Sequence, residues 1–435
     1  MSNTLITPSW VSNESMRLLE NYAKFPGMVE TIGQEDYMQG GAKIGATYNK
    51  RFRPQSWTLN NSPAANVSAV VEVSLPIVLT NQTHIDFQFS SYESTLDVQR
   101  FSERYLDPVV VQLANGIDSS CLQTTNNLFA TAANPIAYAS LASGYGVFNT
   151  YGVPGTSNGI QDILNAGNVL DNYACPRDNN RSIIMSPKQM SVAVPNFVTL
   201  FNPTSNISKI YESGLVDQAL GFDKWAISQN IPKMTNGAFG SGAITVSGAN
   251  QSGSTITITG LPASTSNVLL GGETFVIGST TSNGVFSAQP MTGNATDLQQ
   301  FMVVGGPYNS NGSGTATVSI YPALAVSTSG TNPGNSIQQT TVPANGAAIT
   351  FVGAAGATYY TSLAFHKGAY CFASAELETV ADLGAYSAVA TDKELGLSFR
   401  IGRQWNVSTD QTITRGDVLW GIELLRPGHA TRIVY

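Results

Sequence analysis

The sequence predicts an α+β chain that is interrupted by an all-β, barrel-like insertion. One long stretch, residues 97–130, repeats its apolar residues at helical spacing. Helix and strand patterns alternate through residues 156–226 and resume in residues 344–435. Between them, residues 227–343 carry almost no charged side chains and consist of short apolar runs separated by Gly, Asn and Ser. Regular short strands with turn residues between them are typical of a β-barrel or β-sandwich.

The composition already excludes one broad class of function. Of the 435 residues, 42% are hydrophobic, which is enough to bury a core, and only 11% are charged. The chain has 28 acidic and 21 basic residues, so its net charge is −7. A general nucleic-acid binder needs an excess of Lys and Arg to displace phosphate counterions, so this class is excluded. A surface built from neutral polar residues suits large contacts between identical copies.

The cysteines and the N-terminal residues bear on the cellular compartment. Cys121, Cys175 and Cys371 are widely separated and match neither a metal-ligand spacing nor a disulfide framework, so we expect free thiols in a reducing compartment. The N-terminus lacks the basic and apolar pattern of a secretory signal, and no apolar run approaches the roughly 18 residues of a membrane helix. We therefore expect a chain that is made in the cytoplasm and has no membrane partner.

Residues 1–43 are predicted to form an N-terminal arm. Ser12 or Asn13 caps a short helix that ends at Pro26-Gly27. One stripe of this helix is apolar and consists of Met16, Leu19 and Ala23. Because so short a helix is marginal in isolation, we expect the arm to lie on another surface.

Residues 44–75 are predicted to form a long hairpin. The extended stretches Ile44–Arg53 and Val67–Phe89 flank a polar tip at residues 60–66. An extended arm from Ile44 to Thr58 reaches roughly 50 Å, because a strand rises about 3.3 Å per residue. A hairpin of that length cannot bury itself in its own domain, so we expect it to lie on a neighbouring subunit.

The hairpin carries a basic cluster of three residues, Lys50, Arg51 and Arg53. One interpretation is a solvated strand face. The alternative, which we favour, is an intersubunit interface in which these residues pair with acidic groups beside the long helix of an adjacent copy. The candidate partners are Glu93, Asp97 and Glu103.

Residues 76–155 are predicted to form a domain around the long helix at about residues 97–130. Within this helix, Asp107-Pro108 combines a capping residue with a proline suited to the first helical position, so the helix either starts or kinks there. A loop rich in Gly, Ala and Tyr follows over residues 132–155.

Residues 156–226 are predicted to form the first part of a second domain. A helix is expected at Gly159–Tyr173 and a strand at Arg181–Met185. Ser186-Pro187 is a favourable start for the next helix, and a further helix or turn is expected near Asn206–Ser213.

The insertion, residues 227–343, is expected to have a core of its own and to begin and end at neighbouring points in space. Alternating apolar residues predict this core: Ile256, Ile258, Phe275, Val276, Val318 and Ile320. Charged residues return at His366-Lys367, and we expect mixed helix and strand from there to the C-terminus.

The order of these parts resembles the coat proteins of short-tailed Salmonella-type phages, a branch of the Hong Kong 97-type major capsid fold. GATYNKRFRPQSW with VSAVVEVSL is similar to the E-loop hairpin of that family, and RYLDPVVVQLANGID is similar to its spine helix. SKIYESGLVDQALGFDKWAISQNIP resembles the stretch that leads into the inserted domain, which AITVSG opens. FHKGAYCFASAEL and RGDVLWGIELLRPGHA resemble the closing strands of the capsomer domain.

The resemblance implies a Hong Kong 97-type fold with an N-arm, an E-loop, a spine helix, and P and A domains. It implies a major capsid protein that assembles into hexamers and pentamers of an icosahedral shell around double-stranded DNA, which it contacts non-specifically. The implied partners are a scaffolding protein and a portal protein at one vertex; no cofactor is implied. A scaffold with a basic helical end directs assembly in that family, so the acidic arm residues Glu14 and Glu20 are candidates for scaffold docking.

Two departures from the family pattern are visible. The long polar hairpin that often connects the first strands of the insertion is replaced here by the short turn Gly248–Ser254. The sequence also shows no N-terminal segment that resembles a fused scaffold domain, so a separate scaffolding protein is expected.

No motif in the sequence predicts an enzyme. His84, His366 and His429 have no partner at metal-ligand spacing, and we recognise no HExxH motif, no nucleophile elbow and no Walker loop, so we expect structural histidines. Glu376 and Glu378 alternate on one face of a predicted strand and resemble the carboxylate pair of a glycosidase. The sequence near them, however, offers no aromatic residues of the kind that bind a sugar ring. A solvated or interface role is the better interpretation. The competing function classes are a β-rich adhesin or tail-fibre-like protein and a polysaccharide-degrading enzyme.

Overall fold

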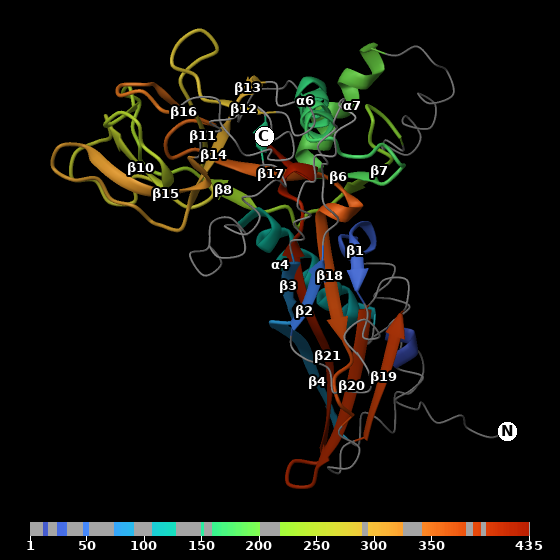
Figure 1. The fold of residues 1–435 in the computed structure, drawn as a ribbon. Helices are drawn as coiled ribbons and strands as arrows, with labels where there is room; N and C mark the ends of the chain where they lie inside the picture. Colours follow the sequence, from blue (N-terminus) through green and yellow to red (C-terminus); the bar gives the residue numbers. More distant parts are fainter. Residues whose placement is uncertain are drawn as a thin grey trace, which may run out of the picture. The chain divides into compact units, whose positions relative to one another are not determined.

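The computed structural model divides into two compact units, which are described separately (Figure 1). Unit 1 comprises Met1–Lys50, Pro76–Thr124 and Tyr370–Glu423, and unit 2 comprises Arg51–Leu75, Thr125–Ala369 and Leu424–Tyr435. The structure describes residues 12–15, 24–32, 47–51, 74–90, 107–127, 149–151, 159–200, 218–288, 295–324, 342–379, 386–392 and 397–434.

Unit 1 is built on a six-stranded sheet with the order β1-β18-β21-β20-β19, in which β4 also pairs with β21. β21, β20 and β19 form an antiparallel meander, and β1 runs parallel to β18. Trp420 of β21 is buried and stacks on Phe372 of β18, with ring centroids 5.9 Å apart. The strands are β1 (Glu30–Ile32), β4 (Asn81–Ser90), β18 (Tyr370–Ala375), β19 (Tyr386–Asp392), β20 (Leu397–Asn406) and β21 (Gln411–Leu424).

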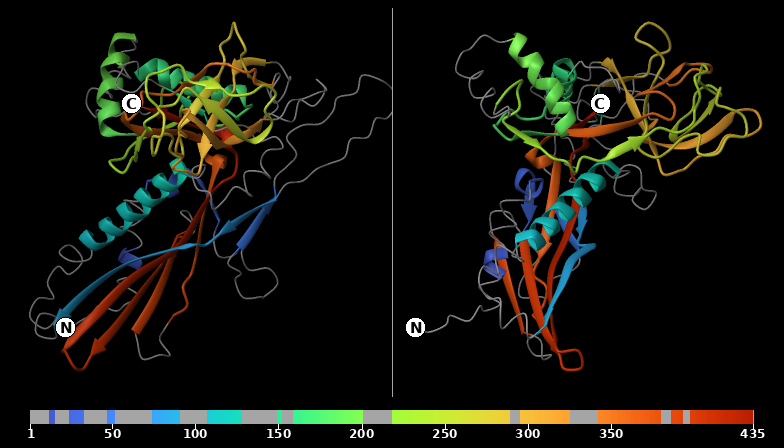
Figure 2. Two further views of the ribbon diagram at one scale, coloured as in Figure 1. Left: turned by 90° about the vertical axis from the view of Figure 1, so that its left-hand side faces the viewer. Right: turned by 180° about the vertical axis from the view of Figure 1, so that it is seen from behind.

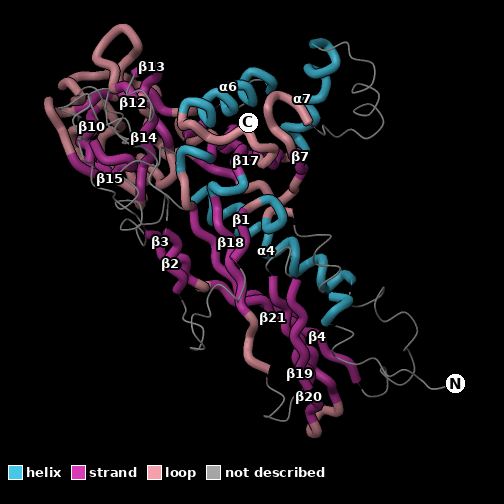
Figure 3. Tube along the Cα trace, turned by 45° about the vertical axis from the view of Figure 1, so that its right-hand side comes forward, coloured by secondary structure: helices cyan, strands magenta, loops and turns pink. Residues whose placement is uncertain are grey.

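The long helix of unit 1 is α4, Asp107–Asn127 (Figure 3). It begins at Asp107-Pro108. The first N–H groups of a helix have no acceptor within the helix, so a proline, which lacks an N–H, loses no hydrogen bond at this position. The sequence left open whether the helix starts or kinks at this point, and the described helix starts there. The rest of the predicted helix, residues 97–106 and 128–130, lies outside the described residues. The apolar stripe is buried and includes Val110, Leu113, Ala114, Ile117, Cys121 and Leu122.

The predicted hairpin is described only at its base. There β2 (Thr47–Arg51) pairs with β3 (Ser74–Val78), so the base extends beyond the predicted limit of residue 75. Residues 52–73, with the predicted tip and most of the return strand, lie outside the described residues.

The first sheet of unit 2 has the order β5-β22-β17-β6-β7, and β8 also pairs with β17. α6 (Gly159–Asn172) and α7 (Pro187–Leu200) contribute to the core that buries this sheet, and the predicted helix and the predicted strand at Arg181–Met185 are confirmed (Figure 2). Ser186 caps α7 as predicted, since its Oγ accepts the Gln189 N–H at 3.2 Å. The strands are β5 (Asn149–Tyr151), β6 (Arg181–Met185), β7 (Lys224–Ile227), β8 (Lys233–Thr235), β17 (Thr358–His366) and β22 (Ala430–Val434).

Two predictions about these regions need correction. The predicted loop at residues 132–155 contains β5, which gains its strand conformation from parallel pairing with the distant β22. Mixed helix and strand was expected after residue 366, but the described residues there form strands and two short 3₁₀ turns, η3 (Lys367–Ala369) and η5 (Pro427–His429).

The all-β part of unit 2 is a closed barrel. Its sheet has the order β16-β11-β14-β15-β10-β9, and a bridge from Thr245 to Ala348 joins the two ends. Hydrogen bonds from Val246 N–H to Ala347 O, at 2.9 Å, and from Ile349 N–H to Ile244 O, at 2.8 Å, complete the closure. The strands are β9 (Thr245–Val246), β10 (Gly253–Thr259), β11 (Thr274–Ile277), β14 (Gln300–Val304), β15 (Thr315–Leu324) and β16 (Ile349–Phe351); a separate hairpin pairs β12 (Phe286–Ala288) with β13 (Ala295–Leu298).

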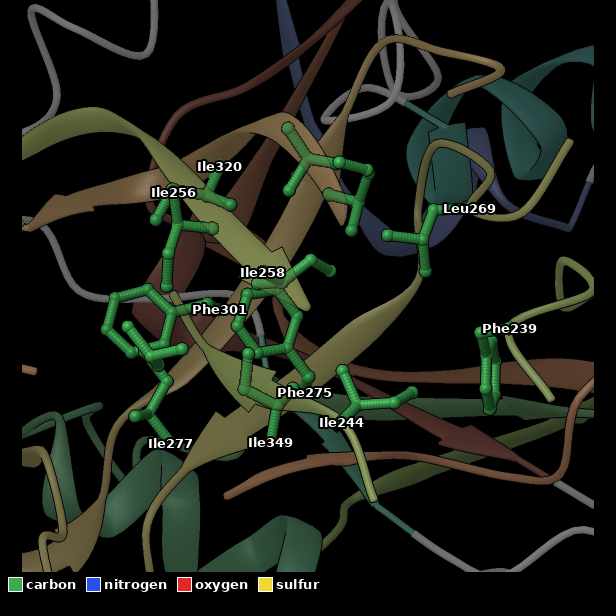
Figure 4. Packing of buried hydrophobic residues seen from close by; sticks show 14 of the residues in the cluster. Phe239, Ile244, Ile256, Ile258, Leu269, Phe275, Ile277, Phe301, Ile320 and Ile349 are labelled. Carbon is green, nitrogen blue, oxygen red and sulfur yellow. The ribbon is translucent and has the colours of Figure 1, made fainter. Parts of the chain in front are cut away.

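The barrel interior is a private core, because every buried member of its cluster lies between Phe239 and Ile349 (Figure 4). Phe275 stacks on Phe301, with ring centroids 5.8 Å apart. In β11 the inward residues are Phe275 and Ile277, so the predicted core residue Val276 points to the other face and is half-buried. Alternation along a strand requires this, since neighbouring side chains lie on opposite faces.

The barrel covers a different segment from the predicted insertion of residues 227–343. Its two ends meet where Asn236 N–H donates to Ala357 O at 2.9 Å and Gly356 N–H donates to Gly237 O at 3.0 Å. β8, which the prediction placed inside the insertion, pairs with the other sheet of unit 2, whereas β16, which it placed after the insertion, belongs to the barrel.

Candidate functional site

The middle of the N-terminal arm, just before Pro26, is anchored to the long helix of unit 1. The backbone N–H groups of Lys24 and Phe25 each donate to the Asp118 carboxylate of α4 at 3.2 Å. Burial raises the pKa of Asp118 to about 6, an increase that these two hydrogen bonds partly offset. Phe25 is fully buried and meets Tyr370 edge-on, with ring centroids 5.8 Å apart. The arm therefore has a fixed attachment on its own chain.

The two arm residues predicted to dock a scaffold are only partly described. Residues 12–15 are helical, and Glu14 is half-buried between the buried Ser12 and Ser15. Glu20 lies outside the described residues. The docking role therefore stays a prediction.

The basic cluster at the base of the hairpin has one partner within the chain. Lys50 of β2 forms an ion pair with Glu30 of β1, a partner that the sequence reasoning missed. Arg51 lies at the end of β2. Arg53 and the three predicted acidic partners, Glu93, Asp97 and Glu103, lie outside the described residues, so the interface also stays a prediction.

A charged network lies across β20 and β21 of unit 1. Asp417 is 1% exposed and accepts hydrogen bonds from Arg400 Nη2 at 2.6 Å and from Arg415 Nε at 2.7 Å. Burial acts to raise the pKa of Asp417, but these bonds outweigh it, and the pKa lies below its usual range. A buried carboxylate held by two guanidinium groups fixes the register of the meander. No sequence spacing links Arg400 to Asp417, so the network could not be predicted.

The tip of the β20–β21 hairpin exposes apolar side chains. Trp405 is 54% exposed, Val407 is 74% exposed and Ile413 is 43% exposed. Clustered exposed apolar side chains of this kind are typical of an interaction surface. The tip is thus a candidate contact between copies.

A buried polar cluster joins the barrel to the sheet within unit 2. Arg432 of β22 is 1% exposed and donates from Nη2 to Gly272 O at 2.7 Å. Glu273 accepts the Gly237 N–H, and burial raises its pKa to about 7. The Tyr359 hydroxyl donates to Asn236 Oδ1 at 2.8 Å. These bonds fix the barrel at the point where the chain enters and leaves it.

Three side chains that the sequence treats as unrelated converge in unit 2. The ligand atoms of Cys175, His366 and His429 all lie within 4.8 Å of one another. Cys175 follows α6, His366 ends β17 and His429 belongs to η5. The three positions are far apart in sequence, so only the pairing of β6, β17 and β22 brings them together, and no spacing rule could have found them.

The remaining sequence candidates have ordinary surroundings. His84 lies 3.5 Å from Asp86, and both side chains are almost half exposed. The three cysteines are free and buried. The prediction that Glu376 and Glu378 share a strand face is wrong, because β18 ends at Ala375 and both residues are exposed beyond it. Glu376 instead accepts the Thr391 hydroxyl at 2.7 Å.

Comparison with known proteins now identifies the family. Residues 55–431 match the family described as P22 coat protein, gene protein 5, which covers most of the chain. The chain belongs to the P22 coat protein family. No curated protein matches it. Within the described residues, no helix has the length and apolar character to cross a membrane.

Several solved structures are similar to this chain over most of its length. Mycobacterium phage Che8 gives a TM-score of 0.43 at 10% identity, covering 89% of this chain and 84% of that one. The capsid of the cyanophage P-SCSP1u gives 0.41 at 12% identity, covering 93% and 85%. The mature capsid of bacteriophage PhiM1 gives 0.43 at 9% identity, covering 94% and 86%.

Membership of the P22 coat protein family fixes the general function. The chain is the major capsid protein of a tailed phage and belongs to the capsid of the virion. Its fold is the Hong Kong 97-type capsid fold, α+β in character, with an all-β barrel as the inserted domain. Self-assembly into an icosahedral capsid follows from this membership.

Proposed function

We propose that this chain encloses double-stranded DNA in its shell by contacts between copies alone, without enzymatic chemistry. The observation that supports this most is the family match over residues 55–431, which includes most of the hairpin, the long helix, the barrel and the closing strands. The net charge of −7 fits a lining that does not grip DNA tightly, since strong attraction would hinder both packaging and ejection. A scaffolding protein directs assembly, and a portal protein occupies one vertex.

In this proposal the hairpin base supplies one intersubunit contact. Lys50, Arg51 and Arg53 face Glu93, Asp97 and Glu103 of a neighbouring copy. In the isolated chain Lys50 pairs with Glu30, so Arg51 and Arg53 carry the contact. Opposite charges across an interface fix its register, and like charges there disfavour assembly strongly.

Charge reversal tests this contact. Arg51→Glu combined with Arg53→Glu should leave the melting temperature of the monomer nearly unchanged, because in this proposal their charges act on a neighbouring copy and contribute little to the fold of one copy. Shell yield, measured by electron microscopy and sedimentation after co-expression with scaffold, should fall sharply. The matched control reverses two exposed lysines elsewhere, Lys188→Glu with Lys224→Glu. Normal shells from the arginine variant would contradict the assignment.

The N-terminal arm is the proposed docking site for the scaffold. Its carboxylates Glu14 and Glu20 attract a basic helical segment, and attraction between exposed charges is screened over about 10 Å at 0.1 M salt. Binding of scaffold should therefore weaken steeply as salt rises. Glu14→Lys with Glu20→Lys should give stable monomers that fail to co-assemble. Salt-insensitive scaffold binding by the arm variant would contradict the proposal.

A further inference from the structure

The convergence of Cys175, His366 and His429 is independent of the assembly surfaces. Among the described residues, these form the one group of Cys, His, Asp and Glu side chains placed to share an ion, with all ligand atoms within 4.8 Å. The two imidazole rings lie edge to face, with centroids 6.0 Å apart. The residues come from three chain segments that the sheet of unit 2 holds together.

His429 has a nitrogen aimed at no protein partner. The side chain is 3% exposed, the Tyr173 backbone accepts a hydrogen bond from its ring, and Nδ1 has no partner among the described residues. Native proteins rarely leave a buried nitrogen unpaired, and an unseen ion is one of the few explanations for such an atom. Because the ring donates its N–H to the Tyr173 backbone, Nδ1 is the nitrogen that carries the lone pair.

His366 is oriented by a carboxylate. Its Nε2–H donates to Asp178 Oδ1 at 2.9 Å, and its Nδ1 accepts the Gly368 N–H at 3.1 Å. The carboxylate fixes the tautomer, which leaves Nδ1 as the nitrogen with a lone pair. A histidine whose second nitrogen donates to a carboxylate is the common arrangement of a metal ligand. A cation at Nδ1 takes the place of the Gly368 N–H and keeps the bond to Asp178.

Cys175 completes the set with a soft ligand. Its Sγ makes a long contact of 3.8 Å to Pro176 O, and burial raises the pKa of this thiol to about 12. A cation must therefore displace the thiol proton, as zinc does when it binds cysteine. The nearby Arg181 guanidinium is already paired with Asp171, at 2.8 Å, and the Asp178 carboxylate beside His366 adds negative charge next to the cluster.

We propose that Cys175, His366 and His429 bind a zinc ion, with a water molecule as the fourth ligand. A thiolate with two imidazoles is a donor set that suits zinc better than magnesium or calcium, which prefer oxygen ligands. Ligand atoms at about 2.0–2.3 Å from a tetrahedral zinc lie roughly 3.3–3.7 Å apart. Side-chain rotations that move the ligand atoms by about 1 Å are therefore enough to bring all three into contact with the ion. The His366 side chain is 12% exposed, which gives solvent access to the fourth position. The ion joins the segment after α6 to the ends of β17 and η5, and thereby stabilises the end of the sheet at which β17 finishes.

Cobalt provides the direct test, because a thiolate bound to tetrahedral cobalt gives a charge-transfer band and intense visible bands. The full chain, dialysed against chelator, should bind one Co²⁺ with these bands, lose them when one equivalent of Zn²⁺ is added, and melt at a higher temperature with Zn²⁺. Cys175→Ser and His429→Gln should abolish the bands and the shift in melting temperature. Asp178→Asn should bind Zn²⁺ about 10-fold more weakly, because it only orients a ligand.

Matched controls separate the site from adventitious binding and from misfolding. Cys371→Ala removes a buried thiol and His84→Gln removes an exposed histidine, and both variants should bind cobalt as the unmodified chain does. If the unmodified chain shows no thiolate band with one equivalent of Co²⁺, or if the two controls lose the bands as completely as Cys175→Ser, the proposal is wrong. The cobalt titration of the folded, unmodified chain decides the first of these outcomes by itself, so a variant that fails to fold leaves it unaffected.

Discussion

The barrel should fold alone only if it is cut where its sheet closes. A fragment of residues 236–357 contains the whole core cluster and both ends that meet at Asn236 and Ala357. A fragment of residues 227–342 is the one that the change in composition along the sequence suggests. It lacks β16 and the segment that closes the barrel. We expect the first fragment to melt cooperatively and the second to lack a cooperative transition.

The expected difference can be worked from the contacts that the shorter end removes. Residues 343–357 supply Ile349, which is 7% exposed, and Phe351, which stacks on Phe239 with centroids 4.6 Å apart. Full burial of an apolar side chain of this size contributes about 1.5–3 kcal/mol, and because Phe351 is only partly buried, the two together contribute about 2–5 kcal/mol. The pairing of β16 with β11 and the two closing hydrogen bonds add about 1 kcal/mol each. The summed loss of stabilising free energy is comparable to the free energy of unfolding of a whole domain, which is roughly 5–15 kcal/mol.

Circular dichroism, thermal melting and dye binding distinguish the two fragments. The fragment of residues 236–357 should give a β-type spectrum and one sharp transition, and that of residues 227–342 a broad one with exposed apolar surface. Phe301→Ala in the fragment of residues 236–357 is an internal control that should cost about 3–5 kcal/mol, since Phe301 is fully buried. Equal, cooperative melting of both fragments would refute the closure argument. A non-cooperative transition in the fragment of residues 236–357 would refute the private core.

Three further substitutions and one matched control test other parts of the structure. Glu273→Gln should flatten the pH dependence of the free energy of unfolding. The pKa of Glu273 is about 7 in the folded chain and 4.5 in the unfolded chain, so the unmodified chain is destabilised by about 3 kcal/mol relative to the variant as the pH rises from 4.5 to 7. Urea unfolding at several pH values measures this difference. Asp118→Ala leaves two backbone N–H groups of the arm without this acceptor, should cost about 1–3 kcal/mol, and should speed proteolysis of the arm. Gly260→Ala, where φ is +90° and a Cβ would meet Ala243 O at 2.2 Å, should cost about 2 kcal/mol or more in the barrel melt. Gly253→Ala, with φ of +93° and open space around it, should cost only about 1 kcal/mol.

Local signals in the sequence predicted the elements that local chemistry determines. Ser186-Pro187 opens α7 because the serine side chain caps the helix and the proline needs no partner. Asp107-Pro108 opens α4, where the proline again occupies a position that needs no N–H donor. The pattern at Arg181–Met185 indicated a strand, and β6 in the structure is buried on both faces.

The failures share one cause, which is pairing between distant segments. Residues 344–365 resemble the insertion in composition, so the return of charge at His366 could not show where the barrel ends. Ile349 belongs to it because β16 pairs with β11, and Asn149 becomes part of a strand because β5 pairs with β22. The loss of strand structure after Ala375 likewise leaves Glu376 and Glu378 without the shared face that alternation predicted.

The pairing of β8 with β17 explains how a barrel can be inserted without disturbing the sheet that carries the cysteine–histidine cluster. These strands are antiparallel, with Thr235 opposite Thr358, so the barrel replaces the turn of a hairpin. A flexible loop of that length would add closure entropy to the folding of the sheet. The barrel avoids this cost, because its own core holds Asn236 and Ala357 within hydrogen-bonding distance of each other. β17 therefore meets the barrel at its first residue, Thr358, and the cluster at its last, His366, so changes in the barrel need not alter the cluster.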